Sequence, residues 1–137
     1  MRRPVRPQDV LSPEHVIQRT IFKHFEQRPA PGVVAWHCPT GGYRRPTEAK
    51  ILSGMGVIKG VSDICAVAPC QCPECGYGPL GIFHALELKT EVGRTSEAQL
   101  EFINKINATG GYAAVAQGLD AALACLEAWG LLKGKTT

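Results

Sequence analysis

The triplet Glu87-Leu88-Lys89 ends a predicted strand and places an acid and an amine two positions apart. Because side chains alternate along a strand, Glu87 and Lys89 share one face with the apolar Phe83 and Ala85. The two charged groups are therefore expected at the rim of a buried layer. There a carboxylate can bind a cation, and an amine can offset negative charge that develops in a reaction.

Asp63 is the acid predicted to lie opposite this triplet. A hairpin of residues 61–68 and 82–89, with its turn centred on Cys75, pairs position 63 with position 87. The two Cβ atoms would then lie roughly 4.5 to 5.5 Å apart, where like charges destabilise a sheet. A hard divalent cation such as Mg²⁺ binds carboxylate oxygens and removes that repulsion. The pairing therefore predicts a cation site between Asp63 and Glu87.

The triplet pattern alone is weak, because an acid and a lysine two positions apart also occur by chance. The chain contains a second example, Glu48-Ala49-Lys50, in a predicted helix where such positions face apart. A simpler interpretation of Glu87 and Lys89 is a solvated ion pair at the end of a strand. The expected proximity of Asp63 is what favours the cation site.

Two polar residues lie on the apolar stripes of predicted helices. Glu14 precedes Ile17 and Ile21 at spacings i+3 and i+7, which places it on the buried side. Alternatively it is a first-turn acid that interacts with the helix dipole. Gln99 also shares a face with apolar residues, but Ser96-x-x-Gln99 matches a capping box. Both roles of Gln99 can hold at once.

Eight elements are expected to position these residues. The sequence predicts helices at 13–28, 47–55, 96–109 and 119–129, and strands at 33–37, 61–68, 82–89 and 112–116. This order predicts one α/β domain over 12–132, with a mixed sheet of about four strands flanked by helices. The central hairpin is antiparallel, and a crossover helix leads to a parallel neighbour. We expect a flexible arm at 1–11, a flexible tail at 133–137, a Cys-rich hairpin loop at 69–81, and core positions for Trp36 and Trp129.

Composition narrows the class of protein. The chain has 137 residues, 45% of them apolar, and 15 basic against 12 acidic side chains give a net charge of +3. This balance permits a nucleic-acid partner without requiring one. No apolar run approaches the length of about 18 residues that a membrane span needs. No apolar segment follows the charged residues at the N-terminus, as it would in a secretory signal. We therefore expect a cytoplasmic protein. Its six cysteines are then expected to be metal ligands or core thiols.

The same residues occur in an order that resembles a known nuclease family. The matching stretches are Trp36-His37-Cys38-Pro39-Thr40-Gly41-Gly42, Gly56 through Asp63, Glu87-Leu88-Lys89, Ser96-Glu97-Ala98-Gln99 and Gly110-Gly111-Tyr112. Over roughly residues 12 to 130 the chain resembles a stand-alone virus-type replication-repair nuclease (VRR-NUC) domain of the PD-(D/E)xK superfamily. It departs from the family at Ser62, where Pro is usual, and at Thr40, where Asn is usual.

The resemblance implies a restriction-endonuclease-like core and a divalent-metal-dependent DNA endonuclease that hydrolyses phosphodiester bonds. The substrate would be branched or junction DNA in replication, recombination or repair. By position, Asp63, Glu87 and the backbone carbonyl of Leu88 would hold Mg²⁺ or Mn²⁺. Lys89 would orient or help deprotonate the attacking water.

The resemblance extends to two helical residues and to the oligomeric state. Glu14 would be an additional acid near the metal, and Gln99 would position the Lys89 region or a phosphate. Stand-alone domains of this family are thought to act as symmetric pairs, so a homodimer is expected. The terminal helix around Leu126 and Trp129 is a possible interface, and equally a core element.

Basic residues flank the Gly-rich connections that lead to Asp63. They fit a surface that contacts DNA phosphates without reading sequence, although each could equally be an ordinary solubilising charge. The candidates for DNA binding are Arg44, Arg45, Lys50 and Lys59.

A separate cluster of Cys70, Cys72 and Cys75 lies at the hairpin tip. Three thiols within six residues suit a structural Zn²⁺ site, which wants four ligands. Reduced free thiols or a labile disulfide are the alternatives. The fourth ligand stays open among Cys65, His84, Cys38, His37 and a second subunit.

Two other functions compete with the nuclease. One is a non-catalytic, zinc-stapled nucleic-acid-binding module that keeps the nuclease fold. The other is a different phosphodiesterase of the superfamily, such as a restriction-type or transposase-type endonuclease. The presence of Asp63, Glu87 and Lys89 favours an enzyme, and the lack of an additional specificity domain argues against restriction. The sequence leaves open the exact DNA substrate and the choice between one and two catalytic metals.

Overall fold

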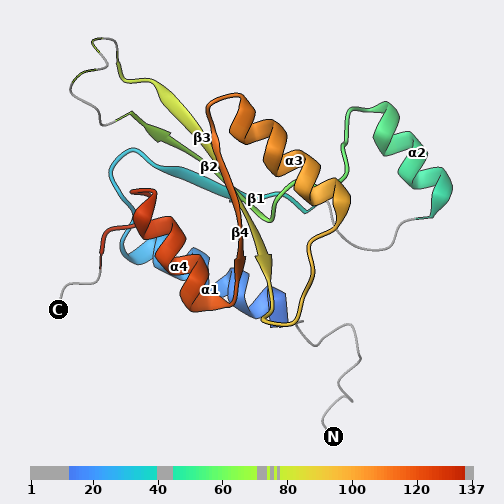
Figure 1. The fold of residues 1–137 in the computed structure, drawn as a ribbon, viewed down its shortest axis with the longest axis horizontal. Helices are drawn as coiled ribbons and strands as arrows, with labels where there is room; N and C mark the ends of the chain where they lie inside the picture. Colours follow the sequence, from blue (N-terminus) through green and yellow to red (C-terminus); the bar gives the residue numbers. More distant parts are fainter. Residues whose placement is uncertain (1–12, 40–44, 71–73, 75, 77, 135–137) are drawn as a thin grey trace, which may run out of the picture.

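A mixed sheet with helices on both faces forms the body of the protein (Figure 1). The computed structural model describes residues 13–39, 45–70, 74, 76 and 78–134. All eight predicted elements are present in the predicted order. They are α1 (Pro13–Gln27), β1 (Val34–His37), α2 (Pro46–Gly54), β2 (Ile64–Pro69), β3 (Gly81–Lys89), α3 (Glu97–Ala108), β4 (Tyr112–Gln117) and α4 (Leu119–Ala128).

The four strands lie in the order β1-β2-β3-β4. The pairs β1–β2 and β2–β3 are antiparallel, whereas β3 and β4 are parallel and are joined through α3. A parallel pair needs such a crossover, because a short turn cannot return the chain to the same end of the sheet. The predicted α/β class, central hairpin and parallel crossover are therefore confirmed. In the described residues, no helix is long and apolar enough to cross a membrane.

Strand alternation divides the core between the two faces of the sheet. One face packs Ile64, Leu86 and Leu88 against α1 and α4, which lie side by side (Figure 1). The opposite face packs Ala85 against Ile103 of α3. Glu87 lies between Leu86 and Leu88 on β3, so its side chain projects toward the face that α3 covers.

The structure decides between the two alternatives for Leu126, because this residue is fully buried in the core between α4 and the sheet. One expectation about an apolar residue is wrong. Trp36 was expected in the core, but its side chain is 39% exposed and packs against the Phe83 ring. The reason is that β1 is an edge strand, whose α3 side is only partly covered.

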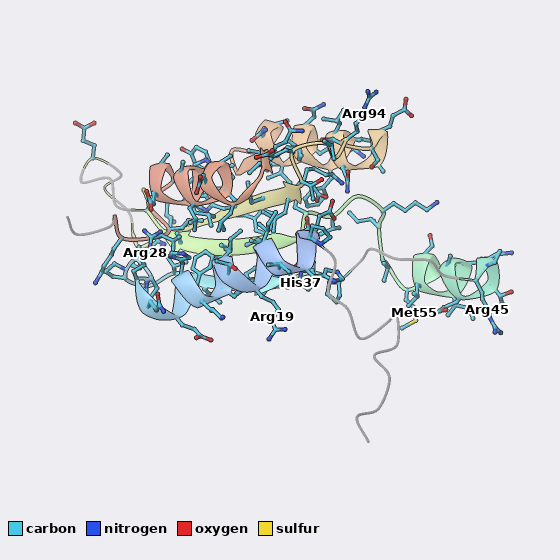
Figure 2. The ribbon with its side chains drawn as sticks, turned by 90° about the horizontal axis from the view of Figure 1, so that it is seen from below. Arg19, Arg28, His37, Arg45, Met55 and Arg94 are labelled. Carbon is cyan, nitrogen blue, oxygen red and sulfur yellow. The ribbon has the colours of Figure 1, made fainter. Side chains whose placement is uncertain are left out.

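The helix α2 stands away from the body, as Figures 1 and 2 both show. None of its residues is buried. The loop that returns from α2 to β2 packs on the first turn of α3 at Gly60, which has a positive φ of 84°. A Cβ at this position would lie 2.3 Å from the backbone of Ala98 and 2.7 Å from the backbone nitrogen of Gln99. Only glycine fits this approach.

We expect Gly60→Ala to destabilise the protein by about 1–3 kcal/mol, because the new Cβ clashes with α3 and the backbone is strained. Gly54→Ala is the matched control, since a Cβ there meets nothing within 4 Å. Thermal and urea unfolding of both variants measure the difference. Equal stability of the two variants would contradict the close packing of the loop on α3.

Candidate active site

Asp63 and Glu87 lie next to each other at one end of the central hairpin. Ile64 pairs with Leu86 in the β2–β3 register, and Asp63 directly precedes this pair, so it lies at the level of Glu87. The Oδ2 atom of Asp63 accepts a hydrogen bond of 2.8 Å from the backbone N–H of Leu88. The geometry thus agrees with the pairing predicted from the sequence.

Glu87 is more buried than Asp63, with 3% of its surface exposed. Its Oε1 atom accepts a hydrogen bond of 2.6 Å from Nε2 of Gln99 and lies 3.3 Å from Nζ of Lys89. Its Oε2 atom is buried and has no hydrogen-bond partner in the described part of the chain. Half of a buried carboxylate is therefore left to be satisfied by something else.

Burial and the negative charge of Asp63 raise the pKa of Glu87 to about 7, and the nearby Lys89 opposes that rise only in part. The carboxylate form is costly here, because desolvation and a like charge both disfavour it. A group that brings positive charge to this position would reverse the balance. Lys89 is itself largely buried, with 12% of its side chain exposed, so its amine stays beside the acid.

Gln99 joins the helix α3 to the acidic pair. Its Oε1 atom accepts from the backbone N–H of Ser96 at 2.8 Å, and Ser96 Oγ accepts from the backbone N–H of Gln99 at 3.2 Å. This is the predicted capping box. The amide nitrogen of the same side chain donates to Glu87. The capping box is confirmed, and the same side chain contacts Glu87. That Gln99 positions the Lys89 region or a phosphate stays a prediction.

The backbone of Asp63 is held by two residues for which the sequence did not predict this role. The carbonyl oxygen of Asp63 lies 2.7 Å from Nδ1 of His37 and accepts a hydrogen bond of 3.2 Å from the backbone N–H of Cys38. The ring and the amide fix the start of β2. Sequence patterns contain no signal for this role, because it depends on the register of β1 against β2.

Glu14 lies in the first turn of α1 and is partly buried. Pro13 and Ile17 of the same turn line a surface hollow together with Thr90, which follows β3. The helix start is thus near the Lys89 end of β3. The described contacts include no hydrogen bond or ion pair from Glu14 to the acidic pair, so its catalytic role stays a prediction.

Three of the four predicted DNA-binding residues lie on α2 or in the segments next to it. Arg45 directly precedes α2, Lys50 lies on it, and Lys59 lies in the returning loop; all three are exposed. Lys59 lines a hollow with Phe102 of α3. Arg44 lies outside the described residues.

The predicted zinc site cannot be located, because Cys72 and Cys75 lie outside the described residues. Cys70 is half-buried, and its backbone N–H donates to the Leu80 carbonyl across the base of the loop. Within the described part of the chain, no three His, Cys, Asp or Glu side chains gather closely enough to hold a metal. Zinc at the hairpin tip stays a prediction.

The acidic pair fits a hard divalent cation. The donors are carboxylate oxygens, one of them the unpartnered Oε2 of Glu87, and such oxygens are the ligands of Mg²⁺ and Mn²⁺. The N–H and C=O of one strand residue point to the same side. Since the Leu88 N–H points to Asp63, its carbonyl faces that side too and is available as a further ligand.

Comparison with known proteins supports the fold. A solved structure described as a VRR_NUC domain protein superposes on this one with a TM-score of 0.65, over 88% of this chain and 89% of that one. The chain has the VRR_NUC fold. Sequence identity over the superposition is 20%. No protein-family model and no curated protein matches the sequence. At this identity the structural likeness establishes the fold alone.

The raised pKa of Glu87 predicts a pH-dependent stability for the protein without metal. The folded state binds the proton more tightly than the unfolded chain, whose Glu87 has the ordinary value of 4.5. This contribution is therefore complete below pH 4.5 and is lost as the pH rises through 7. We expect a loss of roughly 3 kcal/mol in EDTA.

Urea unfolding in EDTA between pH 5 and 8 measures this loss. Glu87→Gln should flatten the profile, because the amide does not titrate. Glu101→Gln, on the exposed face of α3, should keep the slope of the parent protein. Added Mg²⁺ should stabilise the parent more at pH 8 than at pH 5. Equal slopes for Glu87→Gln and the parent would contradict the assignment.

Proposed function

We propose that this protein is a Mg²⁺- or Mn²⁺-dependent DNA endonuclease that hydrolyses phosphodiester bonds. The observation that carries the proposal is the buried, like-charged pair of Asp63 and Glu87, with Lys89 and an unpartnered carboxylate oxygen beside it. A structural ion pair would satisfy both oxygens of Glu87, whereas this arrangement keeps one for a ligand. The VRR_NUC fold supports the same class of chemistry.

The side chains divide the work of the reaction. Asp63, Glu87 and the Leu88 carbonyl would hold the divalent cation, which would supply positive charge beside the phosphate and lower the pKa of a bound water. The ammonium of Lys89 offsets the negative charge that develops on the phosphate in the transition state. Gln99 donates to Glu87 and so holds this carboxylate in one orientation. Its capping box fixes Gln99 in turn.

We further propose branched or junction DNA as the substrate, in replication, recombination or repair. Arg44, Arg45, Lys50 and Lys59 would contact phosphates, which gives affinity without sequence reading. We propose that the protein acts in the cytoplasm of a bacterial or phage-infected cell, as expected from its sequence.

We expect Asp63→Ala, Glu87→Ala and Lys89→Ala each to lower the cleavage rate by roughly 100-fold or more, because each removes a charge that the transition state needs. The assay is a set of labelled four-way junctions, flaps, single strands and duplexes incubated with Mg²⁺, Mn²⁺ or EDTA. EDTA should abolish cleavage.

Glu48→Ala and Lys50→Ala are the matched controls for the chemical step, since this acid and lysine are also two positions apart but lie on the isolated helix α2. Both should cleave bound substrate at the parent rate, and Lys50→Ala should need more DNA for saturation, because Lys50 is a proposed phosphate contact. Folded Asp63, Glu87 and Lys89 variants that cleave every substrate at the parent rate would overturn the nuclease assignment.

A homodimer is part of the proposal, and α2 supports it. None of the nine residues of this helix is buried against the described part of the chain, and helices shorter than about 12–15 residues are marginal in water alone. Two apolar side chains project outward here: Ile51 of the helix is 60% exposed, and Met55, its C-cap residue, is 75% exposed. Figure 2 shows Met55 and Arg45 at a distance from the sheet. A second copy of the chain would cover this surface.

We expect the double variant Ile51→Glu, Met55→Glu to be a monomer in light scattering or sedimentation, because charges on this face oppose apolar association. Val92→Glu is the control, since Val92 is 90% exposed and lies outside α2. It should leave the dimer intact. A parent protein that is monomeric at working concentration and still cuts junctions fully would rule out the dimer.

A further inference from the structure

Two thiols meet directly beside the acidic pair. The Sγ atoms of Cys38 and Cys65 lie 3.5 Å apart, in contact, and both cysteines are free. Cys65 is on β2 and Cys38 directly follows β1, so the contact joins two neighbouring strands. Cys65 is 2% exposed, whereas Cys38 is only half-buried. A small reagent therefore reaches Cys38 first.

This pair of thiols is attached to the backbone that positions Asp63. The N–H of Cys38 donates to the Asp63 carbonyl, and Cys65 lies two residues after Asp63 on the same face of β2. The Sγ atom of Cys65 also contacts the carbonyl oxygen of Ser62 at 3.9 Å. Movement of either sulfur is thus transmitted to the segment that carries the acid.

We propose that Cys38 and Cys65 are a modification site that hydroperoxides convert into a reversible disulfide, and that this disulfide switches off the site at Asp63. The chemical step needs two thiols in contact, one of them accessible, and both conditions are met. The effect on cleavage rests on the proposed nuclease function, but the formation of the disulfide does not.

The reaction balances with hydrogen peroxide as the oxidant. The Cys38 thiolate attacks one peroxide oxygen, the O–O bond breaks, and hydroxide leaves as water after it gains a proton. Cys38 is then a sulfenic acid. The Cys65 sulfur attacks the Cys38 sulfur and releases its proton, the S–O bond breaks, and a second water leaves. Two thiols have lost two electrons to the peroxide.

The disulfide would disturb the acidic pair because it shortens the distance between the Sγ atoms of Cys38 and Cys65. An S–S bond is about 2.05 Å long, so the two sulfur atoms must approach by roughly 1.5 Å. Catalytic groups tolerate displacements of only about 0.5 Å, and a shift near 1 Å can cost roughly 100-fold in rate. Reduction by a dithiol reagent restores the two thiols and the original geometry.

Treatment with hydrogen peroxide, followed by trypsin without reduction, tests the linkage. Cys38 is the only cysteine in its tryptic peptide, 24–44, and Cys65 lies in peptide 60–89. We expect mass spectrometry to find these peptides joined in the parent protein and in Cys70→Ser. They should be separate in Cys65→Ser and after treatment with dithiothreitol. Separate peptides in the oxidised parent would overturn the proposal.

The functional half has its own measurements. Oxidation should lower the cleavage rate at least tenfold in the parent and in Cys125→Ser. In Cys38→Ser and Cys65→Ser the oxidised and reduced proteins should cleave at nearly the same rate. Oxidation should also reduce the stabilisation of the parent by Mn²⁺ in thermal unfolding, which needs no cleavage. A linked protein with unchanged cleavage rate and unchanged Mn²⁺ stabilisation would overturn the switch. Absence of cleavage in the reduced parent would instead count against the nuclease.

Discussion

Repulsion between two acids held together in a buried place is the constraint on which this structure depends. Asp63 and Glu87 lie at the end of the two central strands, and the pairing of β2 with β3 holds them side by side. Lys89, the amide of Gln99 and the N–H of Leu88 offset part of the cost. The part of this cost that is not offset raises the pKa of Glu87. One oxygen of this carboxylate also has no hydrogen-bond partner in the described part of the chain. A divalent cation is the group whose charge and ligand preference complete this arrangement.

The surrounding helices and strands hold each residue of the site through a separate local interaction. The capping box at Ser96 fixes the start of α3, and the same glutamine reaches Glu87. Gly60 lets the loop before Asp63 lie directly on that first turn. On the other side, His37 and Cys38 hold the Asp63 carbonyl. The acids are thus fixed by contacts with α3, β1 and β3, which is the rigidity that positioned catalysis requires.

The site lies at the border between the packed core and the surface. Glu87 is buried enough for electrostatic forces to be strong, whereas Asp63 and Cys38 are only partly buried. This border explains why the half-buried Cys38 lies so close to the buried Cys65 beside Asp63. The helix α2 shows the opposite condition, since none of its residues is buried within the described part of the chain and Ile51 is largely exposed.

The sequence by itself determined the elements, the α/β class and the pairing of Asp63 with Glu87. These follow from local rules: alternation along strands, helix periodicity, the capping box of Ser96 and Gln99, and a hairpin whose register two strands and a turn define. Tertiary structure alone decided the contact of Gln99 with Glu87, the roles of His37 and Gly60, and the meeting of Cys38 with Cys65. It also made β1 an edge strand with Trp36 exposed, and it buried Leu126. The physical reason is that these features depend on how elements far apart in the chain pack against one another, and no periodicity within one element encodes that packing.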